Sequence, residues 1–180
     1  MPVCKMQKGS WLRRLIWLLP IILVVGFDQL TKYLAVVKLK PIDTFPIIED
    51  VLHLTYLENR GAAFGMLADN RWVFMVTSTV AVVGIIVFML LRYPKFDMKQ
   101  PANNVLYLAL AFIAGGGIGN MIDRVANGYV VDFVDFRLIN FAIFNVADIF
   151  VCIGCPLIIL YLILDELRIR KQKNTDGKSE

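Results

Sequence analysis

Two carboxylates lie just outside the most apolar stretches of this chain, beside polar residues that hydrophobic packing does not require. Asp132 interrupts an alternating strand pattern in which Val130 and Val134 point the same way. Asp148 stands at the entrance to the last apolar run, three residues after Asn145. Two acids that share one proton and one water molecule are sufficient to hydrolyse an amide without a metal or a covalent nucleophile. The pair therefore indicates acid–base hydrolysis.

Asp148 also has a purely structural interpretation. The helix dipole favours an acid in a first turn by about 0.3–1 kcal/mol, which would explain Asp148 on its own. This interpretation leaves the neighbouring asparagine and the interrupted strand at Asp132 unexplained. If the two acids meet, they titrate as a coupled pair, in which one is ionised while the other keeps its proton.

Five more polar residues lie at the ends of apolar helices. Asp28 and Lys32 are four apart, share one helix face and should point into the bundle. A structural ion pair is favoured for them over direct catalysis. Asn120, Asp123 and Arg124 also share one face. A structural role is favoured for Asp123, whereas Arg124 could form a salt bridge or present donors to a substrate carbonyl or a lipid head group.

The two outer segments between apolar runs contain strand patterns. Residues 51–57 are rich in β-branched and aromatic side chains, and residues 129–136 follow a turn glycine. These segments predict a small sheet at the membrane surface, with the pairing of strands left open. Asn59 and Gly61 form a turn signal that on its own is weak, and residues 62–67 follow it.

The thiols and the single histidine favour neither redox chemistry nor a metal site. Cys152 and Cys155 have a C-x-x-C spacing, but they lie inside an apolar helix, where no charge would lower a thiol pKa. Cys4 lies outside the apolar runs. His53 has no cysteine at zinc spacing. We expect no metal and no cofactor.

The bulk composition predicts an α-helical integral membrane protein. The 180 residues are 58% hydrophobic, with a mean hydropathy of +0.64. Four runs are long enough to cross a hydrocarbon core of about 30 Å. They lie near residues 15–37, 72–91, 105–122 and 144–164. The third run has Ala111, Gly115 and Gly119 on one smooth face, so we expect it to be central in the bundle.

Basic residues predict the orientation of the four spans. Twelve of the 19 lysines and arginines precede the first span, join the second to the third, or follow the fourth. The positive-inside rule therefore places both termini in the cytoplasm and the acids at the outer face. The net charge of +4 suits anionic lipid and does not indicate nucleic-acid binding. We expect one domain over residues 1–170, a retained first span and a disordered cytoplasmic tail over 171–180.

Taken in order, five motifs resemble those of the lipoprotein signal peptidase family (signal peptidase II), which are aspartic membrane peptidases. The order of motifs, the four-span layout and the length all agree, so the resemblance covers nearly the whole chain. The motifs are Asp28-Gln29-Leu30-Thr31-Lys32, Asn59-x-Gly61-Ala62-Ala63-Phe64, Gly119-Asn120-x-x-Asp123-Arg124, Val131-Asp132-Phe133 and Phe144-Asn145-x-Ala147-Asp148.

The resemblance implies a function and a set of site residues. It implies cleavage of a membrane-bound prolipoprotein before a lipobox cysteine that carries a diacylglyceryl group, by a monomer in the bacterial cytoplasmic membrane. Asp132 and Asp148 match the catalytic dyad of the family. The supporting residues implied are Asn59, Gly61, Asn120, Arg124, Asn145, Asp28, Lys32 and Asp123.

Three other classes of protein could contain acids and glycines in apolar helices. A proton-coupled carrier would place its acids near the midplane of broken helices, often in repeated halves, whereas here the acids cluster at the outer ends and no repeat is found. A thiol–disulfide protein is disfavoured by the apolar setting of Cys152 and Cys155. A scaffold without activity leaves the clustered acids unexplained.

Overall fold

The computed structural model describes residues 16–61, 71–92 and 100–176. Several features considered above lie outside these residues. They are the basic residues before the first span, the stretch 62–67 after the turn, Lys95 and Lys99 between the second and third spans, and the last four residues of the tail.

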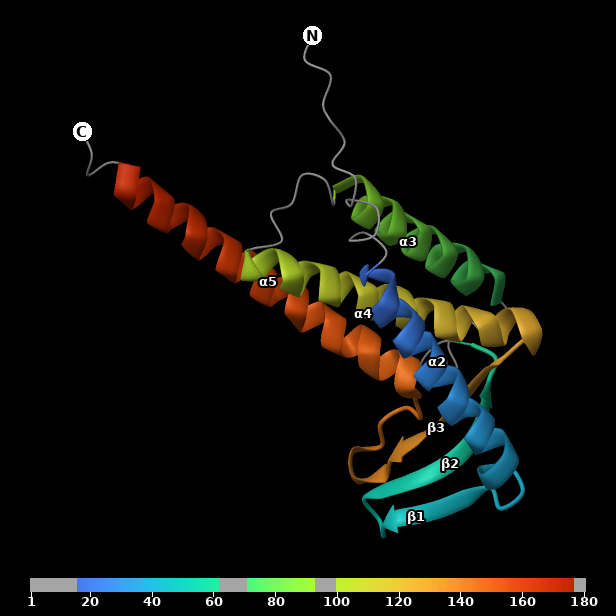
Figure 1. Cartoon of the computed structure of the whole chain (residues 1–180). Helices are drawn as coiled ribbons and strands as arrows, with labels where there is room; N and C mark the ends of the chain where they lie inside the picture. Colours follow the sequence, from blue (N-terminus) through green and yellow to red (C-terminus); the bar gives the residue numbers. More distant parts are fainter. Residues whose placement is uncertain (1–15, 62–70, 93–99, 177–180) are drawn as a thin grey trace.

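Among the described residues, four helices are long and apolar enough to cross a membrane, which confirms the predicted spans. The helix α4 lies at the centre and packs against the other three, as Figure 1 shows. A short π-helical segment, η1, continues the first helix toward the sheet. The elements are α2 (Leu18–Leu34), η1 (Ala35–Leu39), α3 (Arg71–Arg92), α4 (Pro101–Ala126) and α5 (Val146–Asp176).

Small residues on α4 allow the neighbouring helices to approach closely, as the smooth face predicted. A Cβ added at Gly115 would press on the side chain of Val24 in α2. One added at Gly116 would press on the backbone carbonyl of Ala147 and the side chain of Val151 in α5. The glycines of α4 therefore set the distance between the central helix and the first turn of α5.

We expect Gly116→Ala to destabilise the protein by about 1–3 kcal/mol. The new methyl group would collide with the backbone carbonyl of Ala147, which cannot move away as a flexible side chain could. The measurement is thermal unfolding of the purified protein in detergent. Gly84→Ala in α3 is the matched control, since a Cβ there meets nothing within 4 Å. That control should be neutral or gain up to about 1 kcal/mol. Equal stability of the two variants would contradict this account of packing.

Three antiparallel strands form one sheet in the order β1-β2-β3 (Thr44–Ile48, Leu52–Asn59 and Val130–Phe136). The strands β2 and β3 were predicted, whereas β1, which contains Pro46, was not. A proline is tolerated here since β1 is an edge strand. The register between β2 and β3 shifts after the pair Leu54↔Val134, and Leu57 then pairs with Asp132. This irregularity lies beside the candidate acid.

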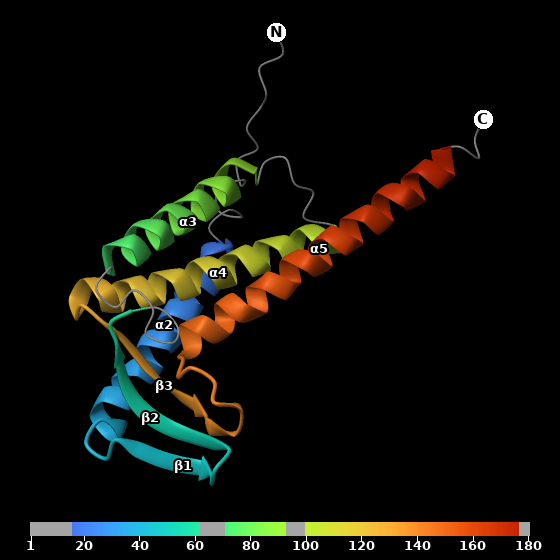
Figure 2. The same cartoon turned by 180° about the vertical axis from the view of Figure 1, so that it is seen from behind.

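The sheet lies at one end of the helix bundle, against η1 and the beginning of α5, as the view from behind in Figure 2 shows. An apolar cluster joins these parts of the chain. It contains the buried residues Ala35, Leu39, Val131, Phe133 and Val146. The strand that carries Asp132 is therefore fixed by packing to the helix that carries Asp148.

The helix α5 is longer than the predicted span and runs to Asp176, into the tail for which disorder was predicted. Glu166 accepts a hydrogen bond from Arg170 Nε at 2.8 Å just before this region, and Lys171, Gln172 and Lys173 are strong helix formers. The tail was predicted from polarity alone, and these local interactions support helix without a hydrophobic face.

Candidate active site

A cleft of about 770 Å³ lies where the sheet meets α4 and α5. One end of the cleft is polar, and Asp132 and Asp148 both line it there. The structure thus brings together the two acids that the sequence singled out. The other polar residues at this end are Asn59, Asn120 and Arg124. Apolar residues extend the cleft along α5 and include Ile149, Ile153, Leu157 and Leu160.

Asp132 is held on β3 with only 2% of its surface exposed. Its Oδ1 accepts a hydrogen bond from Asn145 Nδ2 at 2.6 Å, and its Oδ2 accepts one from Asn59 Nδ2 at 2.9 Å. Burial, and to a smaller extent the charge of Asp148, raise the pKa of Asp132 to about 6 against the opposing effect of these amide donors. This carboxyl group can therefore hold a proton in mildly acidic solution.

Asp148 lies in the first turn of α5, which begins at Val146, so that Asn145 precedes the helix as its cap. The backbone N–H of Asp148 donates to Asn145 Oδ1 at 3.2 Å, and the backbone N–H of Asn145 donates to Asp148 Oδ2 at 3.1 Å. This reciprocal arrangement is a capping box. The second carboxylate oxygen of Asp148 accepts a hydrogen bond from Asn120 Nδ2 at 2.8 Å. Asp148 therefore helps to cap the N-terminus of α5 and also lines the cleft.

The side-chain amide of Asn120 has a single orientation that satisfies its neighbours. Its Oδ1 accepts hydrogen bonds from Lys32 Nζ at 2.8 Å and from Asn145 Nδ2 at 3.0 Å. Because both partners can only donate through these atoms, the Nδ2 of Asn120 is left to donate to Asp148. Lys32 is thereby linked to Asp148 through one amide group.

Asp28, Lys32 and Asp123 form a buried ion cluster behind the cleft. Lys32 Nζ lies 2.9 Å from Asp28 Oδ2 and 3.1 Å from Asp123 Oδ2, and none of the three side chains is more than 4% exposed. Asp28 also accepts a hydrogen bond from the backbone N–H of Ala147, and Asp123 accepts one from that of Val131. The cluster connects α2 and α4 to the elements that carry the two acids. None of its members lines the cleft, which favours the structural ion pair over direct catalysis.

Gln29 has structural contacts that its sequence pattern alone did not predict. Its Nε2 donates to Asp28 Oδ2 at 3.2 Å, to Asp123 Oδ1 at 3.0 Å and to the carbonyl of Gly119 at 3.2 Å. A side chain at Gly119 would collide with the carboxylate of Asp28. An amide beside an acid inside an apolar run was the signal that could have identified Gln29.

Asn59, Gly61 and Arg124 line the polar end of the cleft. Asn59 Oδ1 accepts a hydrogen bond from the backbone N–H of Gly61 at 3.0 Å, so this side chain forms the predicted turn and also holds Asp132. Arg124 Nη1 donates to the backbone carbonyl of Asn120 at 3.3 Å. The guanidinium group lies close enough to both acids to interact with their charges.

Within the described part of the chain, no three or more histidine, cysteine, aspartate or glutamate side chains are grouped so that they could hold a metal ion. His53 is buried in the sheet on β2. The thiols of Cys152 and Cys155 are exposed, and Cys152 lines the cleft. The chemistry that this arrangement offers is that of two carboxyl groups oriented by amide donors.

Comparisons with known proteins agree with this geometry. Residues 20–164 match the family described as signal peptidase (SPase) II. The chain is 44% identical over 142 residues to a lipoprotein signal peptidase of Brevibacillus brevis, covering 79% of this chain and 91% of that protein. It is 39% identical over 156 residues to one from Clostridioides difficile, covering 87% and 100%.

Solved structures show the same fold. One described as a bacterial membrane enzyme superposes with a TM-score of 0.71 at 34% identity and covers 84% of this chain and 89% of its own. A second with the same description gives a TM-score of 0.68 at 34% identity and covers 82% and 92%. The protein is a multi-pass membrane protein. The chain belongs to the signal peptidase II family of aspartic-type peptidases.

Proposed function

We propose that this chain removes signal peptides from bacterial prolipoproteins by cutting before a lipobox cysteine that carries a diacylglyceryl group. The observation that carries the proposal is the pair of acids, Asp132 and Asp148, held by amide donors at the polar end of an otherwise apolar cleft. Membership of the family supports the reaction class, and the relatives cited above are named lipoprotein signal peptidases.

The shape and polarity of the cleft suit a lipidated peptide. Its volume lies within the range of about 300–1,000 Å³ that is usual for ligand sites. The apolar wall formed by Ile153, Leu157 and Leu160 would accommodate the lipid chains or the apolar signal peptide. The scissile bond would then lie at the polar end.

The location of the site follows from the same proposal. Basic residues before the first span and after the fourth favour a cytoplasmic position for both termini. The sheet and the cleft would then lie at the outer face of the cytoplasmic membrane. Lipid chains could stay in the bilayer while the bond to be cut sits at interface depth, within reach of water.

In the mechanism that we propose, Asp148 acts as the base and Asp132 as the acid. Asp148 removes a proton from water as the water attacks the scissile carbonyl carbon. Asp132 donates its proton to the carbonyl oxygen and so forms a tetrahedral diol intermediate. This intermediate expels the amine, which takes up the proton held by Asp148, while Asp132 regains its proton from the hydroxyl group that becomes the carbonyl of the new carboxyl group. Asn120 and Asn145 orient the two carboxyl groups, and Arg124 would hold the substrate carbonyl.

The placement of the proton rests on the surroundings of Asp132. Its burial and the charge of Asp148 raise its pKa to about 6, so it remains protonated at a pH at which an ordinary aspartate is ionised. Loss of that proton leaves the dyad without an acid. The cleavage rate should therefore fall as the pH rises through the upper pKa of the pair.

We expect Asp148→Asn to lower the pKa of Asp132 from about 6 toward the ordinary value for aspartate, because the substitution removes a negative charge that opposes ionisation. The measurement is NMR titration of ¹³C-labelled aspartate carboxyl groups in the purified protein. Asp135→Asn, on the same strand, is the control and should leave this titration in place. A pKa for Asp132 that is unchanged or raised in Asp148→Asn would contradict the coupling.

The proposed substrate is tested by comparing cleavage of a precursor peptide with and without its diacylglyceryl group. We expect turnover of the lipidated peptide to exceed that of the unlipidated one by at least about 10²-fold, because remote binding energy positions the bond that is cut. Equal turnover of the two peptides would contradict the proposed substrate, while leaving the peptidase activity itself in place.

A further inference from the structure

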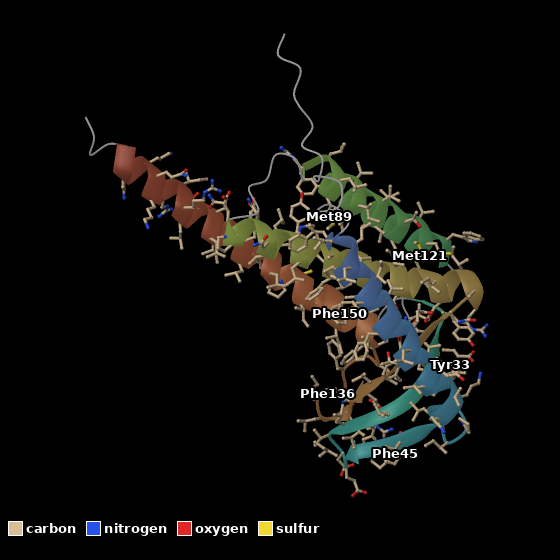
Figure 3. All side chains as sticks on the ribbon, in the orientation of Figure 1. Tyr33, Phe45, Met89, Met121, Phe136 and Phe150 are labelled. Atoms are coloured by element: carbon tan, nitrogen blue, oxygen red, sulfur yellow. The ribbon has the colours of Figure 1, made fainter. Side chains whose placement is uncertain are left out.

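A second cavity lies on the other side of the strand that carries Asp132, and it shares no residue with the cleft. It has a volume of about 390 Å³ and is formed between the outer end of the first span and the sheet. Each strand contributes one apolar side chain, including Phe45 of β1, which Figure 3 labels. The principal apolar residues are Leu34, Ala35, Leu39, Phe45, Leu54 and Phe133.

Of the described residues that line this groove, two have polar side chains, Thr31 and Lys38. Thr31 Oγ1 already donates a hydrogen bond to the backbone carbonyl of Asp28 at 2.8 Å. The exposed Lys38 is the other, and no carboxylate of the described residues lies within ion-pair distance of its ammonium group. Lys40, two residues further on, differs because it pairs with Glu58 at 3.0 Å. The groove therefore combines an apolar interior with one cation that lacks a carboxylate partner within the described chain.

The depth of the groove matches the boundary of the membrane. Lys38 is the last residue but one of the apolar span Leu18–Leu39, so its ammonium group lies at head-group level. Thr31 lies seven residues earlier, or about 10 Å deeper along a helix. The groove thus runs from the head-group region into the hydrocarbon beside Leu34 and Ala35.

We propose that this groove binds an anionic phospholipid, with one acyl chain among the apolar residues and the phosphate group on Lys38. A hydrocarbon chain needs no hydrogen-bond partner, so the apolar lining suits it. A peptide in the same place would bury backbone N–H and C=O groups, which are strongly disfavoured in hydrocarbon unless they find hydrogen-bond partners. The single cation supplies the attraction to a negatively charged head group.

Bound lipid would stabilise the junction between the first span and the sheet. Ala35 and Leu39 line the groove and also belong to the apolar cluster that contains Val131 and Phe133. A chain that fills the space between these elements adds contacts that the folded protein alone lacks. The lipid should therefore raise the temperature of unfolding as it binds.

The experiment uses the purified full chain in detergent after its lipids have been removed. Phosphatidylglycerol, phosphatidylcholine with the same acyl chains, and inorganic phosphate are added separately. Native mass spectrometry measures bound lipid, and thermal unfolding measures stability. We expect phosphatidylglycerol to bind more tightly than phosphatidylcholine and to give the larger rise in unfolding temperature, whereas phosphate alone should have no effect.

Three variants test the contacts. Lys38→Gln should weaken phosphatidylglycerol binding about five-fold, the effect of one lysine near a membrane surface, and leave phosphatidylcholine unaffected. Lys40→Gln is the matched control and should behave as the parent protein. Ile42→Trp, at an exposed position of the groove wall, should weaken the binding of both lipids by filling the space. Equal effects of the two lysine variants, no effect of Ile42→Trp, or stabilisation by phosphate alone would each overturn the proposal.

Discussion

Replacement of either acid by asparagine is expected to reduce cleavage by about 10²–10⁴-fold or more, because an amide can neither remove a proton from water nor donate one to the substrate carbonyl. Both oxygens of Asp132 accept amide hydrogen bonds, from Asn59 and Asn145. An asparagine there has only one accepting oxygen, so one of these bonds must rearrange. Cleavage of a diacylated lipobox peptide by Asp132→Asn and Asp148→Asn should therefore be measured together with their thermal unfolding.

Asp135→Asn is the matched control for this experiment. Asp135 lies on the same strand as Asp132 and is also buried, with 8% of its surface exposed. It bonds to Thr55 and Arg137 and does not line the cleft. We expect Asp135→Asn to keep most of its activity. Substantial cleavage by a folded dyad variant, or an equal loss in Asp135→Asn, would refute the catalytic assignment.

Lys32→Met is expected to destabilise the protein by about 3–5 kcal/mol, because it leaves two buried carboxylates without their shared counter-ion. It also removes the donor that fixes the amide of Asn120, so any folded protein should cleave its substrate slowly. The measurement is thermal unfolding in detergent, followed by a cleavage assay on the folded fraction.

Lys40→Met provides the comparison. Lys40 pairs with Glu58 at 3.0 Å, a distance close to that of the buried pair, but its side chain is 49% exposed. Exposed pairs contribute about 0–1 kcal/mol, so this variant should unfold almost as the parent protein does. If the two lysine variants lose the same stability, the cluster of Asp28, Lys32 and Asp123 does not hold the bundle together.

Contacts within one helix could be predicted from the sequence, whereas contacts between helices could not. The spacing of Asp28 and Lys32 predicted their ion pair, because residues four apart share a helix face. The second partner of Lys32 is Asp123, on a different span. Neither that contact nor the bond from Lys32 to Asn120 follows from spacing, because both depend on how α2 packs against the glycines of α4.

Two other differences between the predicted and the observed structure have local causes, one in a strand and one at a helix boundary. The edge strand β1 was not predicted; it contains Pro46, which argues against a continuing helix but is compatible with a strand at the edge of a sheet. Asn145 was placed inside the fourth helix, whereas the structure uses it as the cap, with Asp148 as its reciprocal partner. The asparagine followed three residues later by an aspartate resembles a capping-box pattern, so this boundary could have been predicted.

The claim on which the mechanism rests is that Asp132 and Asp148 work as one unit on a single water molecule. Single-turnover cleavage by the double variant Asp132→Asn/Asp148→Asn, measured beside both single variants, tests it most directly. Residues that act together give strongly non-additive losses, so the double variant should be slower than the slower single variant by no more than a few-fold. Losses that multiply in the double variant would show that the two acids act independently and would contradict the shared-water mechanism.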